Sequence, residues 1–80
     1  RVLPRDVSVS LSAATDSSIL NILPATVTAL HDSGEHSLML RLDVAPGVAL
    51  QARLTRRSCE ALGLREGMAV YAQVKGAALL

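Results

Sequence analysis

The strongest pattern in this 80-residue chain is an alternation of apolar and polar residues with a period of two. Side chains of a strand point to opposite faces in turn, so this pattern is typical of strands that bury one face. It is clearest over residues 6–12, 25–31 and 36–44. Three more segments read as strands: 48–54, 68–75 and a short one at 77–80. The chain is therefore expected to fold as an all-β domain.

One short helix is expected between Thr55 and Gly63. Thr is a good N-cap because its hydroxyl accepts a hydrogen bond from a free backbone N–H. Gly suits the position after the last helical residue, where the backbone turns left-handed. From Ala25 onward the predicted order is three strands, the helix and two strands. This is the order of an OB-like five-stranded Greek-key barrel with a helix between its third and fourth strands.

The strand at 6–12 precedes this unit and is expected to lie outside the minimal barrel. We expect it to pair with another subunit or with a parent protein. Residues 13–17 are small and polar and read as a linker. The predicted division is a lead-in strand and linker over 1–16 and an OB-like domain over 17–80. Because the first residue is not Met, the chain reads as a fragment or a processed product.

Composition limits the possible functions. The core must be aliphatic, since Tyr71 is the only aromatic residue. A lone Cys59 excludes an internal disulfide, and no Cys/His cluster suggests a metal site. A domain this small buries a modest fraction of its surface, so oligomerisation or attachment to a larger protein is expected to stabilise it. The net charge of +1 gives no general affinity for nucleic acid, and no apolar run is long enough to cross a bilayer.

Three places in the sequence offer hydrogen-bond donors to an anion. They are the polar turn Ser17–Asn21, the helix start at Thr55–Ser58, and Lys75 with Gly76. Cations are disfavoured at a helix N-terminus, so Arg56 and Arg57 suggest that this end faces something negative. A site made only of donors suits a tetrahedral dianion that carries no protons. Each element also has a plain structural explanation, as a turn, a cap or an outward-facing strand residue.

A set of short motifs gives the sequence a family resemblance. The matching segments are Ser17–Leu23 with Ala25–Val27, Leu54-Thr55 with Ser58, Leu62–Leu64 with Gly67, and Tyr71–Lys75. Together they resemble the Mop or TOBE domain, an OB-like molybdate-binding module. It is found in molybdate-storage proteins, in a molybdate-responsive repressor and at the C-terminus of molybdate-transporter ATPase subunits. The last group is the most similar, and the resemblance covers about residues 17–80.

The resemblance implies an oxyanion site at the interface of two subunits. The residues implied in one subunit are Ser18, Ile19, Leu20, Asn21, Lys75 and Gly76. Thr55 and Ser58 would come from the partner, with Ser17, Arg56 and Arg57 as possible supporting residues. Family members usually carry Arg where this chain has Leu20, so one strong donor is missing and Arg56 or Arg57 would have to compensate.

The implied function is a regulatory and dimerising domain of a molybdate importer ATPase. Its ligand would be molybdate or tungstate, without an organic cofactor, a metal or catalytic residues of its own. The parent protein would bind a membrane permease on the cytoplasmic side of the bacterial inner membrane, as a homodimer or higher homo-oligomer. The alternative is a structural dimerisation module without a ligand, which Leu20 favours.

Two further alternatives are weaker. Proteins that bind single-stranded nucleic acid stack bases on aromatic side chains over a basic groove, and this chain offers one Tyr. An enzyme lacks support as well, because no nucleophile–base pair is evident. His31 and His36 flank the Asp32–Glu35 turn and could share a metal, but solvated turn histidines are more common. Cys59 has no His beside it and is expected to pack as a small apolar group.

Overall fold

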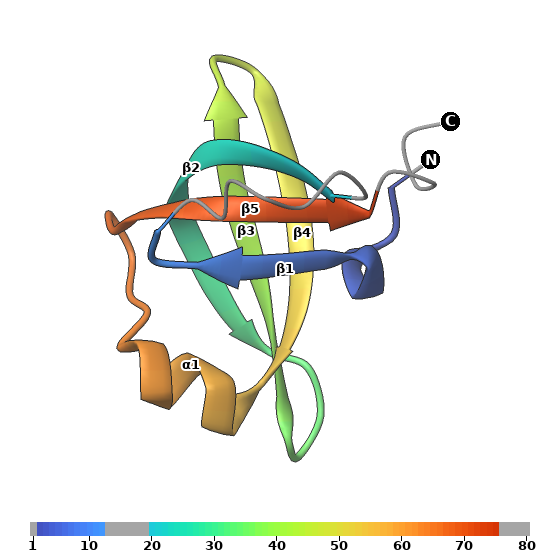
Figure 1. The fold of residues 1–80 in the computed structure, drawn as a ribbon. Coiled ribbons are helices and arrows are strands. Elements are labelled where there is room, and N and C mark those ends of the chain that lie inside the picture. Colours follow the sequence, from blue (N-terminus) through green and yellow to red (C-terminus); the bar gives the residue numbers. More distant parts are fainter. Residues whose placement is uncertain (1, 13–19, 76–80) are drawn as a thin grey trace.

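The computed structural model of this chain describes residues 2–12 and 20–75, and of Leu20 and Lys75 the backbone only. The first elements are η1 (Pro4–Asp6), β1 (Val7–Ser10) and the long strand β2 (Leu20–Asp32). They are followed by β3 (Ser37–Ala45), β4 (Val48–Thr55), α1 (Arg56–Leu62) and β5 (Ala69–Lys75) (Figure 1). The described part of the chain is thus mostly strand, with one α-helix where the sequence predicts it.

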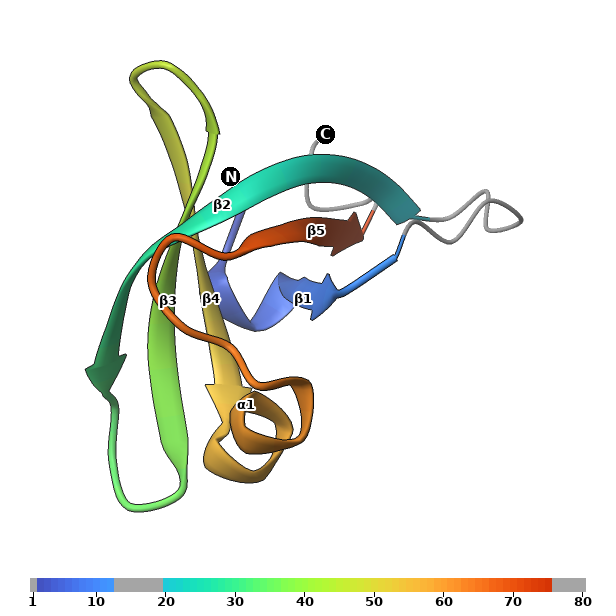
Figure 2. The same ribbon diagram turned by 90° about the vertical axis from the view of Figure 1, so that its left-hand side faces the viewer.

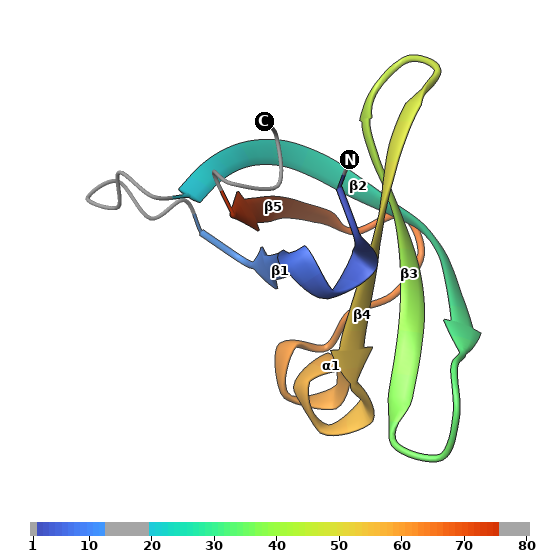
Figure 3. The ribbon, with the colours of Figure 1, turned by 90° about the vertical axis from the view of Figure 1, so that its right-hand side faces the viewer.

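The strands form one antiparallel sheet in the order β1-β5-β2-β3-β4. Hairpins join β2, β3 and β4, and β5 returns after α1 to lie beside β2. This arrangement is a Greek key. The sheet curls until β1 contacts β4, as the side views in Figures 2 and 3 show. Counted from β2, the helix follows the third strand. The OB-like all-β fold is therefore confirmed.

A long curved strand, β2, gives the sheet its shape. Its first half, from Leu20 to Thr26, pairs with β5. Its second half, from Thr26 to Asp32, pairs with β3, with an irregularity between Val27 and Ala29. One strand thus serves two partners in succession and carries the sheet around the core (Figure 2).

The sequence predicts a later start for this strand, because Pro24 reads as its entry. In the structure β2 begins at Leu20, so Leu20 and Asn21 belong to a strand rather than to a polar turn. Proline is tolerated in a sheet where its missing N–H faces no partner strand. Pro24 lies opposite Tyr71 of β5, at a point where β2 has not yet met β3.

The core is aliphatic, as expected, and follows the alternation of the strands. Leu40, Leu42 and Ala52 are completely buried, while their neighbours Arg41 and Arg53 are exposed. The buried apolar set of the described residues is Val7, Ala25, Val27, Leu40, Leu42, Ala52, Cys59, Val70, Ala72 and Val74. Among the residues that the structure describes, no helix is long and apolar enough to span a membrane.

The partner predicted for the N-terminal strand is wrong. β1 pairs with β5 of its own chain, from Val7 opposite Val74 to Ser10 opposite Tyr71. The side chain of Gln73 donates a hydrogen bond of 2.8 Å to Ser10 Oγ and reinforces this pairing. The physical reason is that β2 pairs with only one edge of β5. β1 pairs with the other edge and satisfies its backbone hydrogen-bonding groups. The predicted strand at 77–80 and the predicted boundary between 16 and 17 lie outside the described residues and stay predictions.

A matched pair of valines tests whether β1 belongs to the sheet. Val7 is 2% exposed in the core, whereas Val48 at the β3–β4 turn is 51% exposed. We expect Val7→Ala to lower the free energy of unfolding by about 2 kcal/mol, because it removes buried methyl groups and leaves a cavity. We expect Val48→Ala to change it by less than about 0.5 kcal/mol. Urea denaturation measures both, and equal effects of the two substitutions would contradict the placement of β1.

Candidate functional site

The helix start forms as the sequence predicts. Thr55 is the N-cap of α1, and its Oγ1 accepts a hydrogen bond of 3.1 Å from the backbone N–H of Ser58. The Thr55 hydroxyl in turn donates to Ser58 Oγ at 2.8 Å. At the other end Gly63 has a left-handed backbone, with φ of 65°. Both hydroxyl groups at the helix start are exposed, so they are accessible to a ligand from outside the chain.

Arg56 is bound to the neighbouring hairpin. Its guanidinium donates to Asp32 Oδ1 at 2.9 Å, and its backbone N–H donates to the carbonyl of His36 at 2.8 Å. The β2–β3 hairpin therefore holds the helix start and supplies the negative charge that a cation at this position needs. Arg57 is exposed and forms no ion pair with any described residue. Of the two arginines predicted as support, Arg56 is paired with a carboxylate of the described residues and Arg57 is not.

Behind the helix start, Cys59 packs into the core at 4% exposure, as the sequence analysis expects. Burial raises the pKa of its thiol, a smaller effect of Arg56 lowers the pKa, and Glu60 raises it further. The thiol is therefore held in its neutral form and acts as a small apolar group.

The second group of predicted residues lies where β2 begins and β5 ends. The backbones of Leu20 and Lys75 are directly opposite each other, and Asn21 is opposite Val74. Asn21 is exposed. The predicted residues Ser17, Ser18, Ile19 and Gly76 lie outside the described residues. The structure thus brings the ends of the two predicted segments together through strand pairing.

The two groups lie apart within one chain. In Figures 1 and 2, α1 is at one end of the molecule, and the start of β2 and the end of β5 are at another. The helix start of one copy is therefore not beside the start of β2 in the same copy. A common site would need a second copy, in line with the arrangement that the resemblance implies.

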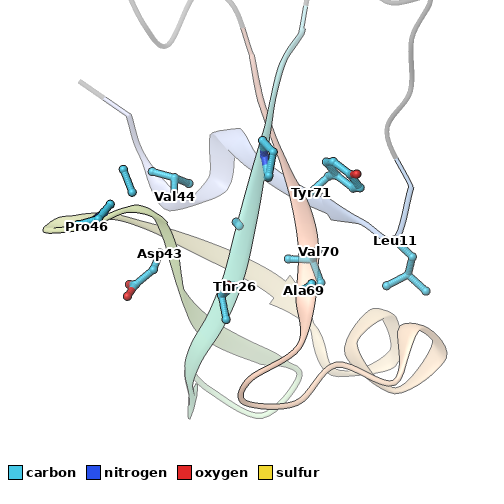
Figure 4. Close-up of a pocket in the computed structure, with 11 residues that line it drawn as sticks. Leu11, Thr26, Asp43, Val44, Pro46, Ala69, Val70 and Tyr71 are labelled. Atoms are coloured by element: carbon cyan, nitrogen blue, oxygen red, sulfur yellow. The ribbon is translucent and has the colours of Figure 1, made fainter.

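Other parts of the described surface fit an oxyanion less well. An open groove of about 670 Å³ lies among β2, the end of β3 and β5, with Pro46, Tyr71 and Leu11 on its walls (Figure 4). Among the described residues that line it, only Asp43 is charged, and Asp43 would repel an anion. Among the described residues no three His, Cys, Asp or Glu side chains gather into a metal-binding group. His36 lies 3.7 Å from Glu35 at the exposed hairpin.

Sequence reasoning did not single out Arg53. It lies on β4 two residues before Thr55, so both side chains project from the same face of the strand. Arg53 lines a small hollow of about 220 Å³ with Arg5, Leu3 and Pro4. The alternation of buried and exposed residues in β4 predicts that Arg53 points outward. It does not indicate that Arg5, 48 positions earlier, lines the same hollow.

Comparison with known proteins identifies the family of this chain. The family model described as "TOBE domain" matches residues 17–80. The chain belongs to the TOBE domain family. This TOBE domain is 58% identical over 80 residues to "Molybdenum import ATP-binding protein ModC" of Aromatoleum aromaticum, covering 100% of this chain and 21% of that protein.

Two more relatives align over the whole TOBE chain. The protein of the same name from Albidiferax ferrireducens is 55% identical over 80 residues. The match covers 21% of that protein. "Molybdenum import ATP-binding protein ModC 1" of Azotobacter vinelandii is 49% identical over 82 residues, with 22% of it covered. The chain therefore spans about a fifth of the length of these curated relatives.

Substitution of Thr55 separates its structural role from any binding role. Thr55→Val removes the oxygen that caps α1, and we expect the free energy of unfolding to fall by about 1 kcal/mol without any ligand. Thr55→Ser keeps the oxygen and should cost no more than a few tenths of a kcal/mol. Urea denaturation distinguishes them, and equal losses for both variants would show that the cap contributes little.

The buried thiol gives a pH prediction. Because the pKa of Cys59 is raised in the folded chain, the unfolded chain ionises first as the pH rises. The contribution of the neutral Cys59 thiol to folding stability is complete below the ordinary thiol pKa of about 8.5. It is lost as the pH rises through the raised pKa of the folded chain. Urea midpoints from neutral to alkaline pH should therefore fall more steeply for the natural chain than for Cys59→Ala. Parallel pH profiles would contradict the shift.

Proposed function

We propose that this chain is the molybdate- or tungstate-binding regulatory and dimerisation domain of a molybdate importer ATPase subunit. The observation that carries the proposal is the match along the whole chain to proteins named for molybdenum import and ATP binding. Membership of the TOBE family supports it, as do the exposed hydroxyl groups at the helix start.

In this proposal two copies share each oxyanion. One copy contributes the segment Ser18–Asn21 together with Lys75 and Gly76, next to Ser17. The partner copy contributes Thr55 and Ser58, with Arg57 nearby. Since Ser58 Oγ accepts a hydrogen bond from the Thr55 hydroxyl, the Ser58 hydroxyl can donate its own hydrogen bond to the ligand. Donors from both copies would then surround a dianion, whereas hydrogen phosphate would lack an acceptor for its proton.

The proposed regulation follows from this sharing. Binding energy that exists only when two copies are correctly arranged shifts the population toward that arrangement. Molybdate at high concentration would thereby hold the two ATPase subunits in one relative position and restrain transport. The domain itself would carry out no chemistry. Its parent ATPase would act with a membrane permease on the cytoplasmic face of the bacterial inner membrane.

A second candidate is a dimerisation module that binds no ligand. Two observations favour it. Leu20 stands where the resembling family usually has Arg, and Arg56 is already neutralised by Asp32 at 2.9 Å. Of the two arginines that could replace the missing donor, Arg56 and Arg57, these observations leave Arg57 to bind the oxyanion.

Thermal unfolding with added molybdate tests the proposed function, with sulfate as the control anion. A ligand that binds only the folded state adds about 2.7 kcal/mol at roughly 100 times its Kd. For a domain of this size we expect molybdate to raise the melting temperature by about 15 °C. Sulfate should leave it nearly unchanged. Sedimentation equilibrium should show a dimer whose association strengthens with molybdate.

Variants of two exposed serines sharpen this test. Ser58→Ala leaves the Thr55 cap oxygen in place but removes a donor from the proposed site, so molybdate should bind about tenfold to a hundredfold more weakly. Ser12→Ala makes the same chemical change beyond the far end of β1, where Ser10 lies opposite Tyr71 rather than near Lys75, and should bind normally. A dimer that takes up no molybdate in equilibrium dialysis would favour the module without a ligand.

A further inference from the structure

Two arginine side chains from distant parts of the chain line one small hollow on the outer side of β4. Arg5 comes from η1 and Arg53 from β4, two residues before its C-terminal end. Leu3 and Pro4 complete its lining, and its volume is about 220 Å³. We call it the Arg5–Arg53 hollow. The proposed oxyanion site does not use any of these four residues.

The position of Arg5 is fixed by its neighbours. Pro4 opens η1, and the N–H of Asp6 donates to the carbonyl of Leu3 at 2.9 Å, which closes the turn. The next residue, Val7, is buried in the core and anchors this segment. η1 therefore rests against β4 (Figure 3), with Leu3 and Pro4 half-buried and Arg5 exposed.

The position of Arg53 follows from the pleat of β4. Ala52 before it is fully buried and Leu54 after it is half-buried, so Arg53 points to the outer side. Its cross-strand neighbour on β3 is Met39, which offers no charge. The fold thus presents two guanidinium groups to one hollow from two separately anchored backbones.

These two arginines differ from Arg41 and Arg56, which are paired with carboxylates. Arg41 lies 3.5 Å from Asp43, and Arg56 lies 2.9 Å from Asp32. Neither Arg5 nor Arg53 forms an ion pair with a carboxylate of the described residues. Two like charges at one hollow repel each other, and an anion placed between them would relieve that repulsion.

The shape and the lining of the hollow limit what it can hold. Pockets for nucleotides and other organic ligands usually measure about 300–1,000 Å³, so this hollow suits a single small group. Guanidinium groups bind carboxylates through pairs of parallel hydrogen bonds. Leu3 and Pro4 supply an apolar wall for the methylene groups of a longer acidic side chain. An inorganic anion would gain nothing from that wall.

We propose that the Arg5–Arg53 hollow docks an acidic segment of a protein partner, with a glutamate carboxylate held between the two guanidinium groups. Exposed ion pairs contribute little singly, so the segment needs several acidic residues, and its binding should weaken as salt is added. The hollow then adds a protein contact to a domain whose proposed ligand is an inorganic oxyanion.

Binding of a fluorescent hexaglutamate peptide to the 80-residue chain tests the proposal by anisotropy. Arg5→Gln and Arg53→Gln should each weaken binding by about threefold, and the double variant by about tenfold. Arg65→Gln removes the same charge from the loop after α1 and should change the affinity by less than about twofold. Hexaaspartate, with shorter side chains, should bind more weakly than hexaglutamate.

The controls decide the outcome. Both side chains are exposed and make no hydrogen bond among the described residues, so the melting temperatures of the variants should match that of the natural chain. Equal losses for Arg65→Gln and Arg53→Gln would overturn the proposal, since they would indicate only a general charge effect. It would also be overturned by unchanged peptide binding in the double variant, or by binding to phosphatidylserine vesicles without binding to the peptide.

Discussion

The pairing of β2 with two different partners is the constraint on which the rest of the structure depends. Its first half is hydrogen-bonded to β5 and its second half to β3. Because one continuous strand makes both contacts, the sheet must curl around the aliphatic core. The same pairing sets Leu20 opposite Lys75, so it joins two of the three segments that the sequence analysis associates with an anion. Loss of this pairing would remove both the core and the proposed site.

The third segment depends on a separate set of contacts. Thr55 caps α1, and Asp32 with the carbonyl of His36 holds Arg56. The helix start is therefore fixed to the β2–β3 hairpin and to β4 at the same time. This explains how a helix of only seven residues keeps a defined direction, which its own hydrogen bonds would not ensure in isolation.

Sequence reasoning succeeded where the information is local. The alternation in β3 and β4 predicts which side chains are buried, and Thr55 with Gly63 predicts the limits of α1. It failed for the partner of β1, because a period of two shows which alternate residues face the core but not which strand lies alongside. The contact between Arg56 and Asp32 was also missed, since it joins residues 24 positions apart. The early start of β2 was hidden by Pro24, whose tolerance depends on the absence of a β3 neighbour at that point.

The position of β1 has a mechanical consequence. Four residues of β1 run antiparallel to β5 and are hydrogen-bonded to it along their length. A pull along the strand from its N-terminal side would load these bonds together in shear rather than open them one after another. Force applied ahead of Val7 is thus passed to β5, whose last residue is Lys75. A movement of the residues ahead of Val7 would therefore displace β5 at its Lys75 end.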